Sequence, residues 1–532
     1  MKYILVFFLL LFSAAMFSQE DAWVYFKDKP NSQSYFEHPL SMLSARSLER
    51  RSTQNIALSS TDVPVEISYV NQIKLSLGIT VLAKSKWLNA LHVRGNQSNI
   101  ATLKSLPFVD KVVFANKTLN ATSKKVTENN LSQINDKLKA TVDYAYGTSA
   151  NQIQMMNGQI LHQQNKTGSG KIIAVLDAGF PGVNTAQPFK KLIDNGQILG
   201  GYDFVNRSEN FYSGDSHGTM VLSTMGGYKE NALVGTAPDA SYYLFITEND
   251  ASENPVEESL WVEAAEKADS LGVDIITTSL GYFAYDNPAY SHTYSDMNGN
   301  TNFISRGAEM AFGKGIIVVA SAGNEGSTEE PHIGGPADAV SVLTVGSVTA
   351  TKVKSSFSSI GPSFDGRIKP ELMAQGTAAV VADAVGNIRT INGTSFSCPV
   401  LAGMIACLWQ AYPNKTNKEI RQMLLESANQ FSSPTNEYGY GIPNFGLNLD
   451  TQAFLSSSVF SVFPNPAQST VSFLFENNTA MVAVFSVLGQ KIMEKELTSQ
   501  NPTLSVENLK SGLYFFTFDS DTLHKTGKII KQ

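Results

Sequence analysis

Three short segments of the 532-residue chain carry an acid, an imidazole and a hydroxyl that could act together in nucleophilic catalysis. They hold Asp177 at the end of an apolar run, His217 in His-Gly-Thr, and Ser395 in Gly-Thr-Ser-Phe-Ser. A serine hydroxyl becomes a useful nucleophile when an imidazole takes its proton and a carboxylate holds that imidazole in the right tautomer. The order Asp, His, Ser is one of the few chain orders known to build such a triad. Because the three residues lie far apart in the sequence, a large fold must bring them together.

A fourth side chain, Asn324, fits the remaining requirement of acyl transfer, which is a donor for the oxyanion. It stands in Ser-Ala-Gly-Asn-Glu-Gly, directly after an apolar run. Its amide would act beside the backbone N–H of Ser395, which we expect at the N-terminus of a helix. Each of the four residues alone has an ordinary structural explanation, as a helix cap, a polar strand end, a hydrogen-bonded core histidine or a turn residue. Their joint pattern favours the catalytic interpretation.

The segments around these residues predict an α/β domain. Apolar, mostly β-branched runs alternate with longer segments of helical spacing, which is typical of a doubly wound parallel sheet with helices on both faces. Functional groups gather at the carboxyl ends of such strands, and Asp177 and Ser279 stand where two of the runs stop. The predicted strands are 171–176, 273–278, 315–320 and 340–345, and the predicted helices are 259–271, 303–312, 394–412 and 418–428.

Changes of composition divide the chain into five predicted parts. A basic start, a short apolar stretch and small residues predict a signal peptide over 1–18. A small α+β domain follows, with strand-like runs at 65–70, 87–93 and 109–114. Short alternating strands near the C-terminus predict a small all-β sandwich. The predicted parts are the signal peptide 1–18, the α+β domain 21–115, a polar linker 116–143, the α/β domain 144–450 and the β-domain 460–532.

The composition of the chain limits the kinds of partner that we expect it to bind. The chain has 40 basic and 47 acidic residues, a formal charge of −7 and no Lys/Arg-dense run, so we expect no nucleic acid partner. After the signal peptide no run is as long and apolar as a membrane span, so we expect no stable transmembrane segment. Cys398 and Cys407 lie on one predicted helix, about 13 Å apart along its axis, which is beyond the reach of a disulfide.

The ordered motifs resemble those of subtilases, the subtilisin-like serine peptidases. The resemblance runs from about Gln152 to Asn448, and Lys369-Pro370-Glu371 fits it as well. The aspartate motif departs from the commoner pattern, since Ala178 has no hydroxyl. The residues after Ser395 depart too, since Phe396 stands where the family more often has Met. The matching segments are 172–180, 217–221, 235–238, 279–281, 321–326, 357–362, 393–399 and 438–441.

This resemblance implies a secreted serine endopeptidase with a subtilisin-like fold. It implies that Ser395 is the nucleophile and His217 the general base and then acid, with Asp177 orienting the imidazole and Asn324 stabilising the oxyanion. Two segments would pair with the substrate backbone by β-augmentation. They consist of Ser279, Leu280 and Gly281, and of Ser321, Ala322 and Gly323. Calcium sites are frequent in the family, but no acidic loop spacing here identifies one, so we assign no metal or cofactor.

The two ends of the chain carry resemblances of their own. Residues 65–114 resemble a subtilase propeptide, which implies that the N-terminal domain acts as inhibitor and folding chaperone and is cut off within 116–143. The Pro464-Asn465-Pro466 start and the basic finish at 525–531 resemble the C-terminal sorting domain of the type IX secretion system of Bacteroidetes. We therefore expect protein or peptide substrates, the secretion machinery as partner, and a secreted or outer-cell-surface location. The competing interpretation is a non-catalytic surface protein that binds peptides or mediates adhesion on the same fold.

Overall fold

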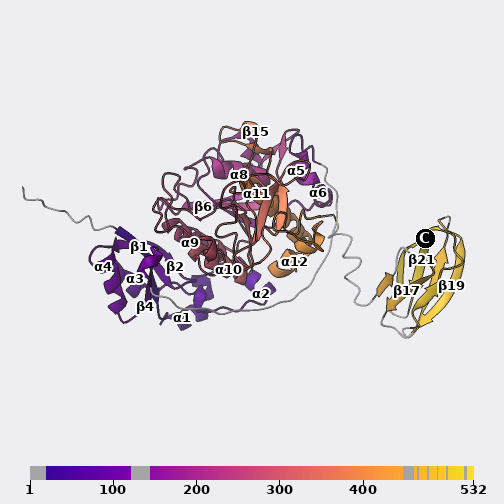
Figure 1. Ribbon diagram of the computed structural model, residues 1–532, viewed down its shortest axis with the longest axis horizontal. Coiled ribbons are helices and arrows are strands. Elements are labelled where there is room, and N and C mark those ends of the chain that lie inside the picture. The colour runs from indigo at the N-terminus through magenta and orange to yellow at the C-terminus, as the bar shows by residue number, and fades with distance from the viewer. Residues whose placement is uncertain are drawn as a thin grey trace, which may run out of the picture. The chain divides into compact units, whose positions relative to one another are not determined.

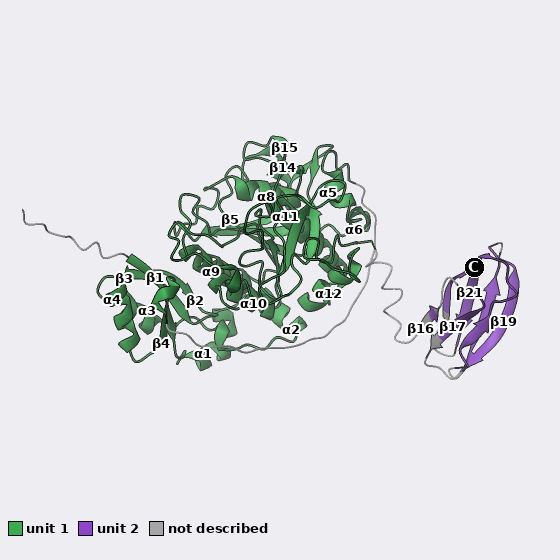
Figure 2. Cartoon of the chain, viewed as in Figure 1, with its two compact units in different colours: residues 1–446 green, residues 447–532 purple. Residues whose placement is uncertain are grey.

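The computed structural model describes residues 19–120, 144–446, 460–463, 467–475, 479–487, 489–498, 501–520 and 524–532. The chain forms two compact units, residues 1–446 and 447–532 (Figure 2). Within the first unit we call residues 19–120 the N-terminal part and residues 144–446 the α/β part. The predicted signal peptide 1–18, residues 121–143 of the predicted linker and the Pro464-Asn465-Pro466 motif lie outside the described residues.

A seven-stranded sheet in which all neighbours run parallel forms the centre of the α/β part. The predicted α/β class is therefore confirmed. All four predicted strands are present, although β12 is displaced toward the C-terminus, and β6, β9 and β13 were missed. In order across the sheet the strands are β13 (Leu372–Gln375), β12 (Leu343–Val348), β11 (Ile317–Ser321), β10 (Ile275–Thr278), β5 (Ile172–Asp177), β9 (Ser241–Ile246) and β6 (Ile198–Asp203).

Helices cover both faces of this sheet. Ala174 and Leu176 of β5 pack in one core with α9 (Val256–Leu271) and α10 (Phe303–Gly313). Ile173 and Val175 alternate with them along the strand and are equally buried, so they face the opposite side. There α8 (His217–Gly226) and α11 (Thr394–Ala411) contact the sheet, and α12 (Asn417–Ser427) packs against α11 (Figure 1).

Helix α11 is the only described helix with the length and composition of a membrane span, and 94% of it is buried inside the first unit. It is therefore accounted for as a core helix. Cys398 and Cys407 both lie on it, buried and free, as the spacing predicts.

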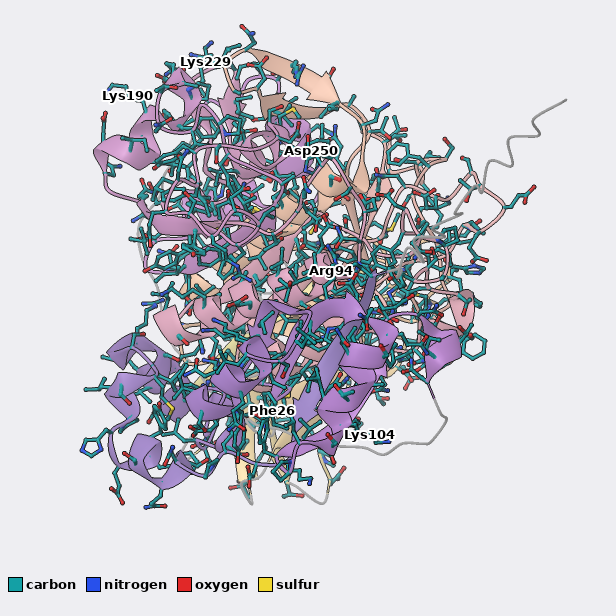
Figure 3. All side chains as sticks on the ribbon, turned by 90° about the vertical axis from the view of Figure 1, so that its left-hand side faces the viewer. Phe26, Arg94, Lys104, Lys190, Lys229 and Asp250 are labelled. Carbon is teal, nitrogen blue, oxygen red and sulfur yellow. The ribbon has the colours of Figure 1, made fainter. Side chains whose placement is uncertain are left out.

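The N-terminal part is a four-stranded antiparallel sheet with short helices. Phe26 and Arg94 come from its adjacent strands β1 and β3 (Figure 3). One face of the sheet packs on helices of its own. Trp23 on the other face, and Trp87 in the turn between β2 and β3, share one core with α9 and α10. The elements are β1 (Gln19–Phe26), α1 (Ser32–Glu37), α2 (Ala45–Thr53), η2 (Ser60–Asp62), α3 (Ile67–Lys74), β2 (Ile79–Ser85), β3 (Ala90–Asn96), α4 (Gln97–Thr102) and β4 (Val109–Phe114).

One predicted strand of the N-terminal part is wrong. The alternating run 65–70 begins helix α3, which buries Val70 and Ile73 on one face and uses Glu66 as its N-cap. Apolar positions three residues apart suit a helix, and the window of six residues was too short to separate the two periods. The run 87–93 is only partly a strand, because β3 begins at Ala90, whereas 109–114 is confirmed as β4.

The second unit consists of antiparallel strands, which confirms the predicted small all-β fold. Two sheets share one core that includes Phe473, Phe516 and Phe518. The alternating runs 471–475, 482–487, 504–506 and 514–518 predict β17, β18, β20 and β21. Strands β16, β19 and β22 were missed, and the last two are rich in lysine and other polar residues. The sheets are β16 (Phe460–Phe463), β17 (Thr470–Phe475) and β20 (Thr503–Ser505), and β19 (Lys491–Thr498), β18 (Thr479–Phe485), β21 (Gly512–Asp519) and β22 (His524–Lys531).

The Lys369-Pro370-Glu371 segment binds the start of strand β12 through a buried ammonium group. Lys369 is fully buried, and its ammonium donates to the carbonyl oxygens of Ala339 (2.8 Å) and Val342 (3.1 Å). It also donates to Thr344 Oγ1 (3.0 Å) and forms an ion pair with Glu371 (2.8 Å). All three donor positions of the ammonium are therefore used inside the protein.

We expect Lys369→Met to destabilise the α/β part by about 3–5 kcal/mol, because it removes one of the two cations that pair with the buried Glu371 carboxylate, the other being Arg421, and leaves several buried carbonyl groups without their donor. The measurement is thermal unfolding in a Ser395→Ala background, from which the expected nucleophile is absent. Lys190→Met is the control, since Lys190 forms only an exposed i,i+4 pair with Asp194. Equal unfolding temperatures for the two variants would contradict the structural role of Lys369.

Candidate active site

Asp177 and His217 form a hydrogen-bonded pair at the carboxyl end of β5. Asp177 is the last residue of that strand and is fully buried, while His217 is the first residue of α8 and is 28% exposed at its side chain. The His217 Nδ1–H donates to Asp177 Oδ1 at 2.8 Å. Because the carboxylate can only accept, this bond places the proton of a neutral imidazole on Nδ1 and leaves Nε2 as the proton acceptor.

The charges around His217 favour its protonated form. The negative charge of Asp177, and to a lesser extent that of Asp215, raises the pKa of His217 above its usual value, although burial opposes the shift. The Asp215 carboxylate accepts the backbone N–H of His217 at 2.7 Å, so it also caps the start of α8. The sequence reasoning missed Asp215, although an acidic residue just before a helix is a recognised start signal.

Asp177 itself is only partly satisfied. Its Oδ1 accepts from the backbone N–H of Ala178 (2.8 Å) and from His217, whereas its Oδ2 is buried and has no hydrogen-bond partner among the described residues. The residue that follows it in the Asp-Ala-Gly motif offers a methyl group and no hydroxyl donor. Asp177 therefore holds the His217 imidazole through Oδ1 only.

Ser395 is the second residue of α11, at its N-terminal end, as predicted. It is 8% exposed, and the Ser279 hydroxyl donates to its carbonyl oxygen at 2.8 Å. Its own hydroxyl donates to the Ser279 carbonyl oxygen at 3.5 Å and not to His217. The ring of the next residue, Phe396, lies 5.8 Å from the His217 ring, centre to centre, so the serine and the imidazole come from adjoining parts of the site. Such nucleophile–base bonds are often long without substrate and shorten when it binds.

Asn324 is fixed beside the start of α11. Its Oδ1 accepts from the backbone N–H of Thr394 (2.9 Å) and from Thr394 Oγ1 (3.1 Å). Because the oxygen is held in this way, the exposed amide NH2 group remains to donate outward. Gly323 makes this turn possible, since its φ is +103° and a Cβ there would lie 2.8 Å from Ser359 Oγ.

The two segments expected to bind substrate backbone leave neighbouring strands at the same edge of the sheet. Ser279 to Gly281 follow β10, while Ser321 ends β11 and is followed by Ala322 and Gly323. Thr278 and Ala320 are paired in the parallel register, so both segments start at one level. Gly281 is exposed and has open space beside its Cα.

Three glutamates come together near this edge, and the sequence reasoning did not find them. The carboxylates of Glu248, Glu253 and Glu257 lie within 4.8 Å of one another. Glu257 accepts from the backbone N–H groups of Asn249 and Asn254, and burial raises its pKa to about 7. Glu248 accepts from the Tyr282 hydroxyl, and burial raises its pKa well above the usual range. Because burial favours the neutral, protonated forms of Glu248 and Glu257, the three carboxyl groups can lie together without a cation, and we assign none to them.

Three family models match three parts of the chain. Residues 168–441 match the model of the subtilase family, 21–132 match the peptidase S8 propeptide domain of Bacteroidota, and 461–532 match the secretion system C-terminal sorting domain. Subtilisin E of Bacillus subtilis is 30% identical over 295 residues, which are 55% of this chain and 69% of that protein. Serine protease AprX of the same species is 28% identical, covering 58% of this chain and 72% of that protein.

Among solved structures, the crystal structure of MycP1 with the N-terminal propeptide removed is 23% identical, with a TM-score of 0.46, and covers 56% of this chain and 96% of that one. Because this structural similarity is low, we assign the family from the sequence matches alone. The family model covers more than half of the chain, in the part that contains the parallel sheet. The chain belongs to the subtilase family of serine peptidases, with a propeptide domain before the peptidase part and a secretion sorting domain after it.

Proposed function

We propose that this protein is a secreted endopeptidase that hydrolyses peptide bonds through an acyl-enzyme on Ser395, with Asp177 and His217 completing the triad. The observation that carries the proposal is the His217–Asp177 hydrogen bond at the sheet edge where α11 begins, with Ser395 as the second residue of that helix. That bond leaves Nε2 of His217 free to accept a proton. The fixed Asn324 amide next to Thr394 supports a second role, oxyanion stabilisation.

The chemistry follows from these positions. His217 Nε2 takes the proton of Ser395 Oγ as that oxygen attacks the peptide carbonyl carbon, and Asp177 stabilises the imidazolium. The Asn324 amide and the Ser395 backbone N–H donate to the oxyanion of the tetrahedral intermediate. His217 then gives the proton to the leaving amine, and water, activated by the same imidazole, hydrolyses the acyl-enzyme.

Substrate binding and maturation complete the proposal. Ser279, Leu280 and Gly281, together with Ser321, Ala322 and Gly323, would pair with the backbone of an extended peptide. Residues 21–115 would serve as inhibitor and folding chaperone, with cleavage in 116–143 separating them from the 144–450 domain. The signal peptide 1–18 and the 460–532 domain would direct export through the type IX secretion machinery to the medium or the outer cell surface. The matches to propeptide and sorting domains support these roles.

The first test is covalent labelling with a fluorophosphonate. We expect stoichiometric labelling of the processed protein at Ser395 and none in Ser395→Ala, because only an activated serine reacts. The Ser395→Ala protein should also keep its N-terminal part covalently joined when no other protease is present. A folded, processed protein that takes up no label would instead support the alternative, a non-catalytic peptide-binding or adhesion protein on the same fold.

Asn324→Ala should lower kcat about 100- to 1000-fold, the loss that follows removal of one such donor from a subtilisin. KM should change little, because the amide acts on the oxyanion and not on the bound substrate. Steady-state kinetics on a peptide substrate measure both constants. A rise in KM with an unchanged kcat would show that Asn324 only positions substrate.

Asp215→Asn should move the acidic limb of the kcat/KM profile to lower pH. His217 acts as a base only when neutral, so activity falls as the pH drops through its pKa. That pKa is raised by Asp177 and by Asp215, and removing the Asp215 charge lowers it while the amide oxygen can still accept the His217 N–H. Asp194→Asn, which removes an exposed carboxylate paired with Lys190, is the control. An unmoved limb would exclude a contribution of Asp215 to the charge of the imidazole.

A further inference from the structure

One segment of the N-terminal part lies outside the antiparallel sheet of that part. It reaches the end of the parallel sheet where β5, β10 and β11 begin. We call residues 44–62, which include α2 and η2, the amino-edge clasp. Arg46 donates from Nε and Nη2, at 3.0 and 2.9 Å, and Gln54 Nε2 donates at 2.8 Å. Their acceptors are the carbonyl oxygens of Gly272, Gly170 and Gly315, which precede β10, β5 and β11 respectively. The clasp thus joins three chain segments that are far apart in sequence.

Two arginines of the clasp are buried against one carboxylate of the α/β part. Arg50 and Arg51 are 7% and 2% exposed, and Asp269, near the C-terminal end of α9, is fully buried. Arg51 Nη2 donates to both Asp269 oxygens, at 2.9 and 2.8 Å, and Arg50 Nη2 donates to Oδ1 at 2.5 Å. Arg50 also donates to the carbonyl oxygen of Val273. Charges buried this deeply require their partners, because water does not replace them.

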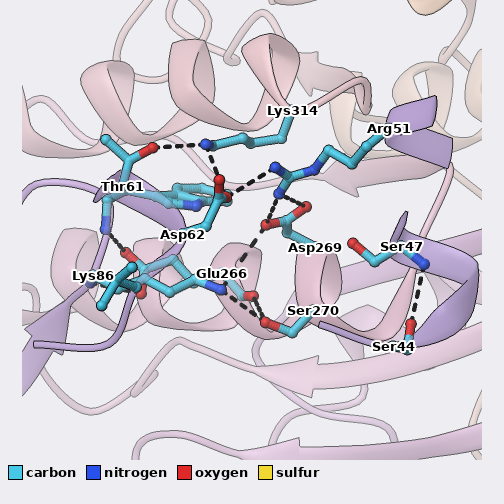
Figure 4. A network of polar contacts seen from close by, with 12 residues as sticks. Ser44, Ser47, Arg51, Thr61, Asp62, Lys86, Glu266, Asp269, Ser270 and Lys314 are labelled. Carbon is cyan, nitrogen blue, oxygen red and sulfur yellow. Dashed lines mark hydrogen bonds and ion pairs between the residues drawn. The ribbon is translucent and has the colours of Figure 1, made fainter. Parts of the chain in front are cut away.

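The N-terminal part also supplies a buried acid that pairs with a base of the α/β part. Asp62 of the clasp is fully buried and lies 2.9 Å from Lys314 Nζ, a residue of the α/β part, and 2.9 Å from Arg51 Nη1 (Figure 4). Lys314 also donates to Thr61 Oγ1 at 2.6 Å. Each part therefore contributes an acid and a base to a shared buried network, in which Arg51 pairs both with Asp62 of its own part and with Asp269 of the α/β part.

This network lies away from the proposed active site. The clasp contacts residues that precede β5, β10 and β11, whereas Asp177, Ser279 and Ser321 stand at the opposite ends of these strands. A strand of six residues spans about 20 Å. The clasp can therefore hold the N-terminal part whether or not the substrate-binding edge is occupied.

We propose that the amino-edge clasp is a second binding site for the N-terminal part, and that it keeps this part bound after the chain is cut between residues 120 and 144. Cleavage alone then does not release the N-terminal part. Release requires the Arg50/Arg51–Asp269 and Asp62–Lys314 pairs to open together. The proposal concerns binding at the amino edge and holds whether or not Ser395 is the nucleophile.

The test uses full-length Ser395→Ala protein with a recognition sequence for a site-specific protease inserted between residues 120 and 144. After cutting and dilution, gel filtration measures how much N-terminal part co-elutes with the α/β part, and a dilution series gives the dissociation constant. We expect the cut parent to stay associated and Arg51→Met to raise the dissociation constant more than 100-fold, because Asp269 and Asp62 lose a buried partner.

Arg94→Met is the matched control. Arg94 pairs with Asp21 inside the N-terminal part, so its loss removes the same charge without touching the clasp. A dissociation constant for Arg51→Met equal to that of Arg94→Met would overturn the proposal, as would a cut parent that separates as readily as Arg51→Met.

Thermal unfolding of the uncut chains identifies a variant that does not fold. In that case Asp269→Asn, which keeps the shape and one acceptor oxygen, replaces it, with weaker binding expected and unchanged binding contradicting the clasp. Fluorophosphonate labelling of the unaltered enzyme tests the triad separately.

Discussion

Parallel pairing of β10 with β5 on one side and β11 on the other is the constraint on which the site depends. Because these strands run in one direction in close register, their carboxyl ends meet at a single edge. Asp177 ends β5, and Ser279 and Asn324 follow β10 and β11. His217 is the first residue of α8 and Ser395 the second residue of α11. Both helices contact one face of the same sheet, and their N-terminal ends reach this edge.

The N-terminal part covers a different surface of the same framework. Its sheet packs Trp23 and Trp87 on α9 and α10, where Ser259 accepts the Trp23 indole N–H at 2.8 Å. Glu266 of α9 accepts from Ser85 Oγ and from two backbone N–H groups of the same turn, while burial raises its pKa to about 7. The interface therefore combines a large apolar contact with a few buried polar groups that fix its orientation.

Buried charges recur at the points where distant segments must meet. Lys369, just before β13, binds residues 339–344 at the start of β12, and Asp269 receives two arginines from the N-terminal part. Glu258 accepts from Tyr285, His292 and the backbone N–H of Ile304, and so ties the 283–302 loop to α9 and α10. Each of these groups has a partner from another segment, which makes the arrangement specific because any other pairing would leave a charge buried alone.

The sequence by itself determined the α/β class, most of the central strands and helices, and the identity of the four proposed catalytic residues. It could do so because buried β-branched runs and helical spacing are local signals, and because the Asp, His, Ser order is read directly from the chain. The helix at 67–74 was misread as a strand because six residues show either period. Asp215 stands two residues before His217 and was overlooked although it is a local helix-start signal. Only the tertiary structure gathered the carboxylates of Glu248, Glu253 and Glu257 and buried Arg50 and Arg51 against Asp269, which lies more than 200 residues away in the sequence. Such contacts follow no periodicity, so they are decided by how the helices, strands and loops pack and not by a local pattern.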